Sequence, residues 1–307
     1  MRARVVAVSV SVEKGTRKTP VEQVMLRAGL GIEGDAHAGH THRQVSLLPQ
    51  ESIAEMQKLG LLVGPGDFAE NITTQGMSLA RLPLGTRLTA GTAVLSITQV
   101  GKVCHERCAI YYQAGDCVMP REGVFAAVLR DGVVASGMSL IAWPRFRVLV
   151  VTLSDRCFGG EQVDESGRVL ADEFALLGTL VTKVLLPDEF TLLRDLLIAT
   201  CDANRADLIV TTGGTGLSPR DVTPEATRAS IEREAPGFAE AMRMHSLAIT
   251  PHAMLSRAVA GTRKQTLIVN LPGSAKGAME CLQVFLPALP HALDVLSGVT
   301  LDCGRSH

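Results

Sequence analysis

A glycine-rich turn at residues 211–216 (TTGGTG) is the first segment of this chain that could do chemistry on phosphate. The apolar run 206–210 has the pattern of a buried strand, so the turn falls at the carboxyl end of that strand. Glycines at such a position let backbone N–H groups approach an anion closely. The turn lacks the Gly-Lys-Ser/Thr of a Walker A loop, and taken alone it could be only a tight turn.

Three carboxylates near this turn extend the interpretation to a metal ion. Asp221 follows the turn closely, and Thr223 and Pro224 behind it predict the cap and the first residue of a helix. Asp188 and Asp155 each follow another predicted strand, so all three acids are expected at one edge of the sheet. An aspartate among phosphates makes sense where Mg²⁺ lies between them. Helix capping or loop solvation is the alternative role of Asp155 and Asp188.

The elements that must position these residues are those of an α/β domain. After Phe146, apolar runs of strand length alternate with helical patterns, which is typical of βαβ units around a parallel sheet buried on both faces. We therefore predict a doubly wound, mainly parallel-sheet α/β domain over residues 146–307. Its strands are expected at 147–154, 180–186, 206–212 and 265–270, and its helices at 187–204 and 223–234.

The first half of the chain has a different pattern. Short alternating runs separated by glycines predict a β-barrel over residues 1–143, with helices only near 49–61 and 123–129. Because Pro144 stops any regular element, the boundary between the two domains is expected at residues 143–145.

Composition limits the classes of function. The 307 residues are 46% hydrophobic and 20% charged, which is typical of a folded chain, and the length favours two domains. The net charge of −1 includes no basic run of the kind that binds nucleic acid, and no apolar stretch is long enough for a membrane span. The first half carries net +3 and the second half −4. We expect a cytoplasmic protein with no nucleic-acid or membrane partner, whose seven cysteines are reduced thiols.

A cysteine cluster is the main chemical feature of the first half. Cys104 is flanked by lysine, histidine and arginine, which favour its thiolate and hence nucleophilic sulfur chemistry or binding of a soft metal. A buried, inert thiol is the alternative. His105, Cys108 and Cys117 could complete a metal or cluster site with Cys104, although C-x3-C is not a zinc-ribbon spacing.

Two further motifs in the first half are weaker signals. Residues 29–34 fit GxGxxG, but they lack the strand and helix that a dinucleotide site needs. His37, His40 and His42 lie close enough in sequence to bind a metal. A solvated polar loop, or a loop that holds an anion, is the interpretation we favour for these histidines.

Short motifs follow one another along residues 147 to about 298. They are Ser154-Asp155-Arg156, Pro187-Asp188-Glu189, Thr212-Gly213-Gly214-Thr215-Gly216, Arg220-Asp221-Val222-Thr223-Pro224-Glu225-Ala226-Thr227, Pro236-Gly237, Met254-Leu255-Ser256-Arg257 and Leu267-Ile268-Val269-Asn270-Leu271-Pro272-Gly273. In this order they closely resemble the MogA family of molybdopterin adenylyltransferases. The resemblance implies transfer of AMP from Mg-ATP to the terminal phosphate of molybdopterin, with release of pyrophosphate.

The same resemblance implies roles for individual residues. Acids that match Asp188 and Asp221 are essential in the family, so both are expected to be catalytic and to organise Mg²⁺ and pyrophosphate. Ser256, also expected to be catalytic, matches a serine that affects handling of the product, although it could only cap a turn. The other residues expected to hold nucleotide, phosphate or pterin are Ser154, Asp155, Thr212, Gly213, Gly214, Thr215, Gly216, Arg220, Asn270, Pro272 and Gly273, of which the last two could merely end a strand.

The first half resembles a second family. Its motifs are Gly31-Ile32-Glu33-Gly34-Asp35-Ala36-His37, Arg43-Gln44-Val45-Ser46-Leu47-Leu48, Glu70-Asn71-Ile72-Thr73 and Leu84-Gly85-Thr86-Arg87-Leu88. Together they resemble the MOSC family (molybdenum cofactor sulfurase C-terminal-like), whose members are β-barrels thought to carry sulfur or to bind the molybdenum cofactor. Cys104 falls on the characteristic cysteine of that family, with Val103 where a proline is common.

The principal hypothesis is therefore an enzyme of molybdenum cofactor biosynthesis that adenylylates molybdopterin and binds or modifies the cofactor through Cys104, by ligating molybdenum or carrying sulfur. A non-catalytic molybdopterin carrier or chaperone is the alternative, but a passive binder gains nothing from carboxylates beside phosphates. A Rossmann oxidoreductase lacks a credible fingerprint. The resemblance also implies a homotrimer, with a molybdate-insertion protein and molybdoenzymes as further partners, and leaves molybdenum or tungsten open as the metal.

Overall fold

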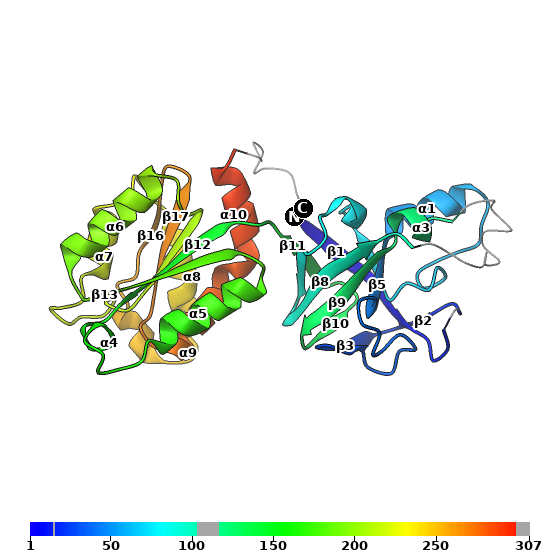
Figure 1. The fold of residues 1–307 in the computed structure, drawn as a ribbon, viewed down its shortest axis with the longest axis horizontal. Coiled ribbons are helices and arrows are strands. Elements are labelled where there is room, and N and C mark those ends of the chain that lie inside the picture. Colours follow the sequence, from blue (N-terminus) through cyan, green and yellow to red (C-terminus); the bar gives the residue numbers. More distant parts are fainter. Residues whose placement is uncertain (15, 103–116, 299–307) are drawn as a thin grey trace. The chain divides into compact units, whose positions relative to one another are not determined.

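The chain forms two compact units, Met1–Pro144 and Arg145–His307, in the computed structural model. The structure describes residues 1–14, 16–102 and 117–298. Figure 1 traces both units, and each is described here by itself. None of the helices in the described part of the chain is long and apolar enough to span a membrane.

The first unit is a β-barrel that closes on itself. Its strand order is β11-β7-β8-β9-β5-β6-β1, and β1 also pairs with β11, which leaves only β2 outside the ring. The ring strands are β1 (Arg2–Val10), β5 (Val45–Pro49), β6 (Ile72–Gln75), β7 (Arg87–Ala90), β8 (Ala93–Val100), β9 (Val124–Arg130) and β11 (Ser139–Trp143). Around them lie β2 (Thr19–Val21), the small sheet of β3 (Gln23–Arg27), β4 (Gly31–Ile32) and β10 (Gly132–Ala135), and the helices α1 (Gln50–Lys58), η1 (Leu79–Arg81) and α3 (Met119–Glu122).

The barrel that the alternating pattern predicts is confirmed, with one wrong element. Residues 123–129 were expected to be helical, but strand β9 occupies them. Val124, Ala126 and Val128 alternate along β9 and all three enter the barrel core, so a period of two governs the segment. The helical turn is α3, and it ends at Glu122, immediately before the strand.

A fully buried ion pair stabilises the barrel. The side chains of Lys18 and Asp35 are both 0% exposed, and their charged atoms lie 2.5 Å apart. Burial alone would raise the pKa of Asp35, but hydrogen bonds from His37 and Lys18 outweigh burial and hold that pKa well below its ordinary value. The contribution of Asp35 to stability is therefore complete above the pKa of an unfolded aspartate and decreases as pH falls toward the lower pKa of the folded state.

Asp35→Asn should lower the free energy of unfolding of the barrel by about 3–5 kcal/mol, because it leaves the buried Lys18 ammonium without its carboxylate. Urea denaturation measured at neutral pH tests this value. The wild-type barrel should also lose stability below about pH 4, where the variant should change less. A variant as stable as the wild type would show that the pair contributes nothing to the fold.

The second unit is an α/β domain around a six-stranded sheet of order β13-β12-β14-β17-β16-β15. The first four strands are parallel and the last two pair in antiparallel fashion. The strands are β12 (Arg147–Leu153), β13 (Leu180–Leu186), β14 (Leu208–Thr212), β15 (Arg233–Glu234), β16 (Ala260–Arg263) and β17 (Thr266–Leu271). The helices are α4 (Asp155–Phe158), α5 (Glu165–Leu176), α6 (Phe190–Asp202), α7 (Thr223–Arg228), α8 (Pro236–Leu247), η2 (Pro251–Leu255), α9 (Ala275–Phe285), η3 (Leu286–Ala288) and α10 (Leu289–Leu296).

Helices cover both faces of this sheet, which confirms the doubly wound, mainly parallel fold. Figure 1 shows α6 and α7 on one side of the sheet and α5 and α9 on the other. Side chains of α6 and α7 share one apolar cluster with alternate residues of β12 and with Ile209 of β14 and Ile268 of β17. The strand expected at 180–186 is confirmed as β13, but β13 is an edge strand and is not buried on both faces, since Leu180 is 71% exposed. The carboxyl ends of β12, β13, β14 and β17 lie along one edge of the sheet.

Candidate functional site

The glycine-rich turn after β14 is packed so closely that it requires glycine. Gly213 has φ +96°, and a Cβ added to it would lie 2.2 Å from the carbonyl oxygen of Leu153 at the end of β12. A Cβ on Gly273, after β17, would lie 3.2 Å from the Cα of Gly213. The turn therefore touches the ends of both strands that flank β14.

The carbonyl groups of the turn are held by hydrogen bonds from elsewhere in the domain. Thr223 donates from Oγ1 to the Gly213 carbonyl at 2.8 Å and from its backbone N to the Gly214 carbonyl at 3.1 Å. Thr223 was expected to cap α7, but the helix begins at Thr223, and Val222 occupies the N-cap position without a side-chain capping hydrogen bond. The hydroxyl group of Thr223 therefore donates a hydrogen bond to the turn and does not cap the helix.

Arg257 completes this support and was not singled out by the sequence. Its backbone N donates to the Thr215 carbonyl at 2.9 Å, and its Nε donates to the Gly216 carbonyl at 2.6 Å. Its Nη2 reaches the Asp221 carbonyl at 2.6 Å. The one available signal was its place directly after Ser256 in a motif of the family that the chain resembles.

The last three backbone N–H groups of the turn differ from its carbonyl groups. Within the described part of the chain, the backbone N–H groups of Gly214, Thr215 and Gly216 have no hydrogen-bond partner. Three successive free N–H groups form the kind of concavity that binds phosphate oxygens.

Asp155 and Asp188 form a reciprocal pair of hydrogen bonds beside the turn. The backbone N of Asp155 donates to Asp188 Oδ2 at 3.0 Å, and the backbone N of Asp188 donates to Asp155 Oδ1 at 3.0 Å. This reciprocal pair joins the ends of β12 and β13. Burial raises the pKa of Asp188, and the like charges of Asp155 and Asp221 raise it further, although hydrogen bonding opposes them. The local field around Asp188 therefore favours a cation or a proton.

The three predicted acids share one cavity with part of the turn. A polar cavity of about 660 Å³ is lined by Asp155, Asp188 and Asp221. Asp221 is fixed by a hydrogen bond from the backbone N of Ser218 to its Oδ2 at 2.8 Å. The other predicted residues on this cavity wall are Ser154, Thr212, Gly213, Gly214 and Gly273.

Four more of the predicted pocket residues face a second cavity. This mainly apolar cavity of about 310 Å³ lies against α8, η2 and α9. Its lining includes Thr215, Gly216, Ser256 and Pro272. The turn thus contributes to both of these cavities, Gly213 and Gly214 to the polar one and Thr215 and Gly216 to the apolar one.

Arg220 does not line either of these cavities. Its guanidinium contacts both carboxylate oxygens of Asp155, at 2.9 Å and 3.0 Å, and Glu189 Oε1 at 3.1 Å. The hydrogen bond from Arg220 is the main reason that the pKa of Asp155 is lowered. Its expected role as counter-charge for phosphate stays a prediction, and it requires Arg220 to exchange these carboxylates for phosphate oxygens.

Asn270 corrects another expectation, because it is wholly buried and lines neither cavity. Its Oδ1 accepts from the backbone N of Val259 at 3.1 Å. Its Nδ2 donates to the hydroxyls of Thr211 and Thr227 at 2.9 Å and 2.8 Å. Asn270 therefore ties β17 to β14 and α7 below the site and acts as a positioning residue.

Asn270→Ala should reduce the free energy of unfolding of the domain by about 2–4 kcal/mol, because it leaves buried groups without partners. Urea denaturation followed by circular dichroism measures the change. Gln265→Ala, at an exposed position of the same hairpin, is the matched control and should be neutral. Equal effects of the two substitutions would contradict the positioning role.

The cysteine cluster of the first unit falls mostly outside the described residues. Cys104, His105 and Cys108 belong to the segment 103–116, which the structure does not describe. Cys117, the first residue of the described part that follows, is buried. Within the described residues, no group of three or more potential ligands could hold a metal ion.

Two family models match the chain. Residues 149–291 match the family described as a probable molybdopterin binding domain, and residues 34–140 match the MOSC domain. The chain is 43% identical to the molybdopterin adenylyltransferase of Helicobacter pylori over 152 residues, which covers 48% of this chain and 86% of that protein. It is also 43% identical to the Escherichia coli protein of the same name over 142 residues, which covers 45% of this chain and 72% of that protein.

Similar proteins also include a longer chain and a solved structure. Gephyrin of Dictyostelium discoideum is 42% identical over 48% of this chain and 22% of its own length. The crystal structure titled as the molybdopterin biosynthesis enzyme MoaB of Thermus thermophilus is 51% identical, covers 50% of this chain and 97% of that chain, and superposes with a TM-score of 0.46.

Proposed function

Because this chain belongs to the molybdopterin-binding family through residues 149–291 and carries a MOSC domain before it, we propose that it adenylylates molybdopterin with Mg-ATP. The AMP group passes to the terminal phosphate of molybdopterin and pyrophosphate leaves. The observation that carries this proposal is the row of free N–H groups at Gly214, Thr215 and Gly216 beside three aspartates. A phosphate cradle and a cation site side by side suit a reaction between two phosphorylated substrates.

The proposed reaction requires the protein to position the substrates and to neutralise phosphate charge, and it requires no dedicated base. A phosphate nucleophile is already ionised at neutral pH, so no proton has to be removed from it. Mg²⁺ commonly takes one or two carboxylates and completes its shell with substrate oxygens and water. Asp188 and Asp221 fit this need, since both line the polar cavity and the field there favours a cation. When bound, the ion would neutralise phosphate charge.

The two cavities support a division of the substrates. The polar cavity suits phosphates and pyrophosphate, whereas the apolar cavity suits a ring system, either pterin or adenine. Ser256 lies on the apolar side with Thr215 and Gly216 and is proposed to contact the product there. Bound substrate would thus extend across the turn, and its phosphate oxygens would accept hydrogen bonds from the backbone N–H groups of the turn.

We propose two functional modules, residues 1–143 and 146–307, of which the first binds or modifies the cofactor through Cys104, by holding molybdenum or carrying sulfur. Fusion of two modules raises the effective concentration of an intermediate at the second site. A molybdate-insertion protein and molybdoenzymes are the expected partners downstream.

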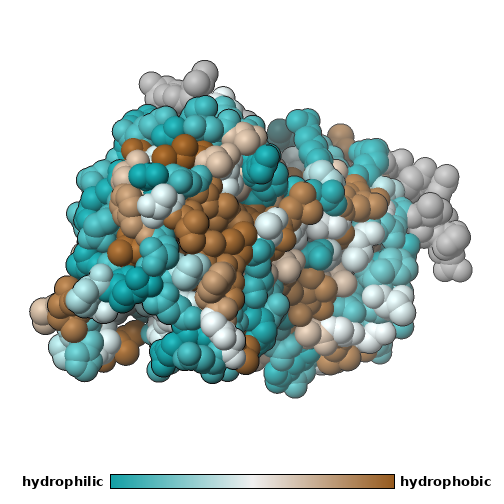
Figure 2. All heavy atoms as spheres, turned by 60° about the vertical axis from the view of Figure 1, so that its left-hand side comes forward, coloured by the Kyte–Doolittle hydropathy of each residue, from teal (hydrophilic) through white to brown (hydrophobic). Residues whose placement is uncertain are grey.

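A homotrimer is part of the proposal. Hydrophobic side chains reach the surface of the α/β unit, which comes forward in Figure 2. On α8 and η2, the exposed apolar residues outside the lining of the apolar cavity are Met244, Leu247 and Met254. Exposed apolar surface of this kind is what a subunit interface would bury. Light scattering on the purified protein would measure the mass of the assembly.

One assay tests the proposed function. Purified protein is incubated with Mg-ATP and molybdopterin, and pyrophosphate and adenylylated pterin are both measured. Formation of both products in equal amounts is the expected result. Binding of molybdopterin without ATP turnover under any condition would overturn the enzymatic proposal in favour of a carrier or chaperone.

A further inference from the structure

Arg220 joins the loops that follow three neighbouring strands of the parallel sheet. Its own loop lies between β14 and α7, and its guanidinium contacts Asp155, directly after β12, and Glu189, directly after β13. Glu189 is the N-cap residue of α6, but its side chain makes no capping hydrogen bond and accepts from Arg220 instead. One guanidinium therefore connects the carboxyl ends of β12, β13 and β14.

The carboxylate of Asp155 is engaged on both oxygens. Its Oδ2 accepts from Arg220 Nε at 3.0 Å, and its Oδ1 accepts from Arg220 Nη2 at 2.9 Å and from the backbone N of Asp188 at 3.0 Å. Two hydrogen bonds from one planar guanidinium fix the direction of a carboxylate as well as its distance. Asp155 is therefore held toward Arg220 and Asp188, although it lines the polar cavity.

The carboxylate of Asp188 has one engaged oxygen and one free oxygen. Its Oδ2 accepts from the backbone N of Asp155 at 3.0 Å, whereas its Oδ1 accepts no hydrogen bond from any described residue. This Oδ1 lies against the glycine-rich turn, because a Cβ added to Gly214 would lie 3.2 Å from it. The reciprocal pair thus holds Asp188 with its free oxygen beside the turn, where the proposed cation and phosphates would meet.

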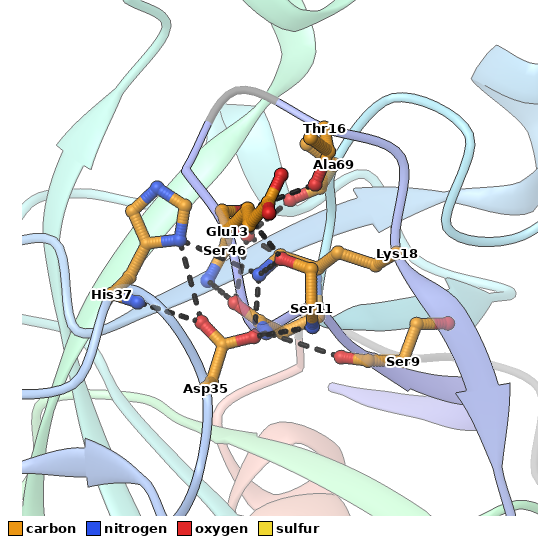
Figure 3. A network of polar contacts seen from close by, with 10 residues as sticks. Ser9, Ser11, Glu13, Thr16, Lys18, Asp35, His37, Ser46 and Ala69 are labelled. Carbon is orange, nitrogen blue, oxygen red and sulfur yellow. Dashed lines mark hydrogen bonds and ion pairs between the residues drawn. The ribbon is translucent and has the colours of Figure 1, made fainter.

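The contacts of Arg220 are too exposed to matter mainly for the fold. In the barrel, the ion pair of Lys18 and Asp35 is wholly buried among other polar contacts (Figure 3). The side chains of Arg220, Asp155 and Glu189 are instead 54%, 46% and 52% exposed. Exposed ion pairs contribute little to stability, because water competes for both partners. We therefore expect these contacts to hold the geometry of the site more than the fold.

We propose that Arg220 is a positioning residue, which sets the place of the Asp188 carboxylate through Asp155 and keeps its carboxylate contacts when substrate is bound. In this role Arg220 touches neither phosphate nor cation, and Asp188 and Asp221 remain the acids that are available to a cation. The effect of Arg220 on adenylylation rests on the proposed function. Its effect on the loops after β12 and β13 does not, and it can be measured without substrate.

Hydrogen exchange of the substrate-free, full-length protein tests the contacts directly. The amide protons of Asp155 and Asp188 form the reciprocal pair, so NMR of these two amides reports on it. Arg220→Gln should accelerate exchange at both amides by about threefold, which is the scale of an exposed ion pair. Arg168→Gln breaks another exposed ion pair of the α/β unit, outside the lining of both cavities, and should leave both amides unchanged. Unchanged exchange in Arg220→Gln would overturn the proposal.

The adenylylation assay separates positioning from contact with phosphate. Arg220→Gln should lower kcat by about tenfold or more, with the KM for ATP changed by about twofold or less, because a displaced carboxylate affects the reaction more than substrate binding. Arg220→Lys keeps the charge but cannot form the bidentate contact, so it should stay close to Arg220→Gln. A nearly wild-type Arg220→Lys, together with a raised KM for ATP in Arg220→Gln, would show a direct phosphate contact and overturn the proposal.

A double variant tests whether Arg220 acts through Asp155. Asp155→Asn keeps the shape of the side chain and removes the charge that Arg220 holds. The variant with both Asp155→Asn and Arg220→Gln should be no slower than the slower single variant, because the two residues act as one unit. Multiplied losses of kcat would contradict this. If even the wild-type protein forms no product, the proposed function fails, and hydrogen exchange still decides whether Arg220 holds the two aspartates.

Discussion

Asp221→Asn should lower kcat for adenylylated molybdopterin by about 10²–10³-fold or more, which is the scale of losing one group that stabilises transition-state charge. Asparagine has the shape of aspartate, and its Oδ1 can still accept the hydrogen bond that Ser218 donates to Asp221 at 2.8 Å. The turn and cavity should therefore survive, and only the negative charge is lost. The defect should persist at saturating ATP and molybdopterin, because the substrates still bind to the free N–H groups of the turn.

Asp195→Asn is the matched control for this experiment. Asp195 is 60% exposed on α6 and pairs with Arg194 away from the polar cavity. The control should form product at the wild-type rate, and both proteins should unfold at the same temperature. If Asp221→Asn also forms product at the wild-type rate, Asp221 has no part in organising the cation.

The position of the site in the α/β unit was predictable because it depends on backbone topology. Apolar runs specify the parallel strands, and the residues after them must meet at one edge of the sheet. This is why the sequence alone predicts that Asp155, Asp188 and Asp221 lie close together, as they do around the polar cavity. Side-chain direction was not predictable in the same way, because it depends on partners distant in sequence.

Asn270 and Arg220 show this second limit. Their partners are hydroxyls of Thr211 and Thr227 in one case and the carboxylate of Asp155 in the other. Those contacts join elements more than 40 residues apart, and no local pattern marks them. Resemblance to a family marks such residues as important without showing whether they touch substrate.

The barrel was harder to predict in detail. The segment 124–130 contains six apolar residues in succession, which fit a helical turn as well as a strand. The segment forms a strand rather than a helix because it pairs with β8 and β5, and this pairing cannot be recognised in a single sequence. Cys104 lies outside the described residues, so its role stays a prediction.

Gly213→Ala should lower the free energy of unfolding of the α/β unit by about 2–5 kcal/mol. One part of this cost is the backbone conformation, since φ is +96° at Gly213. The other part is steric, since the new Cβ would lie 2.2 Å from the Leu153 carbonyl oxygen, which belongs to a buried strand and cannot move freely. Activity should fall further than stability explains, because a displaced turn moves its free N–H groups away from the phosphates.

Gly160→Ala measures the cost of backbone strain without the steric cost. Gly160 also has a positive φ, +79°, but a Cβ there meets nothing within 4 Å. It should lose only about 1 kcal/mol from backbone strain and keep wild-type activity. Urea denaturation and the adenylylation assay measure both effects in each variant. Equal losses of stability and activity in the two variants would show that the turn can accommodate a side chain at Gly213. The close packing of the three strand ends would then not be what holds the N–H groups of the turn in place.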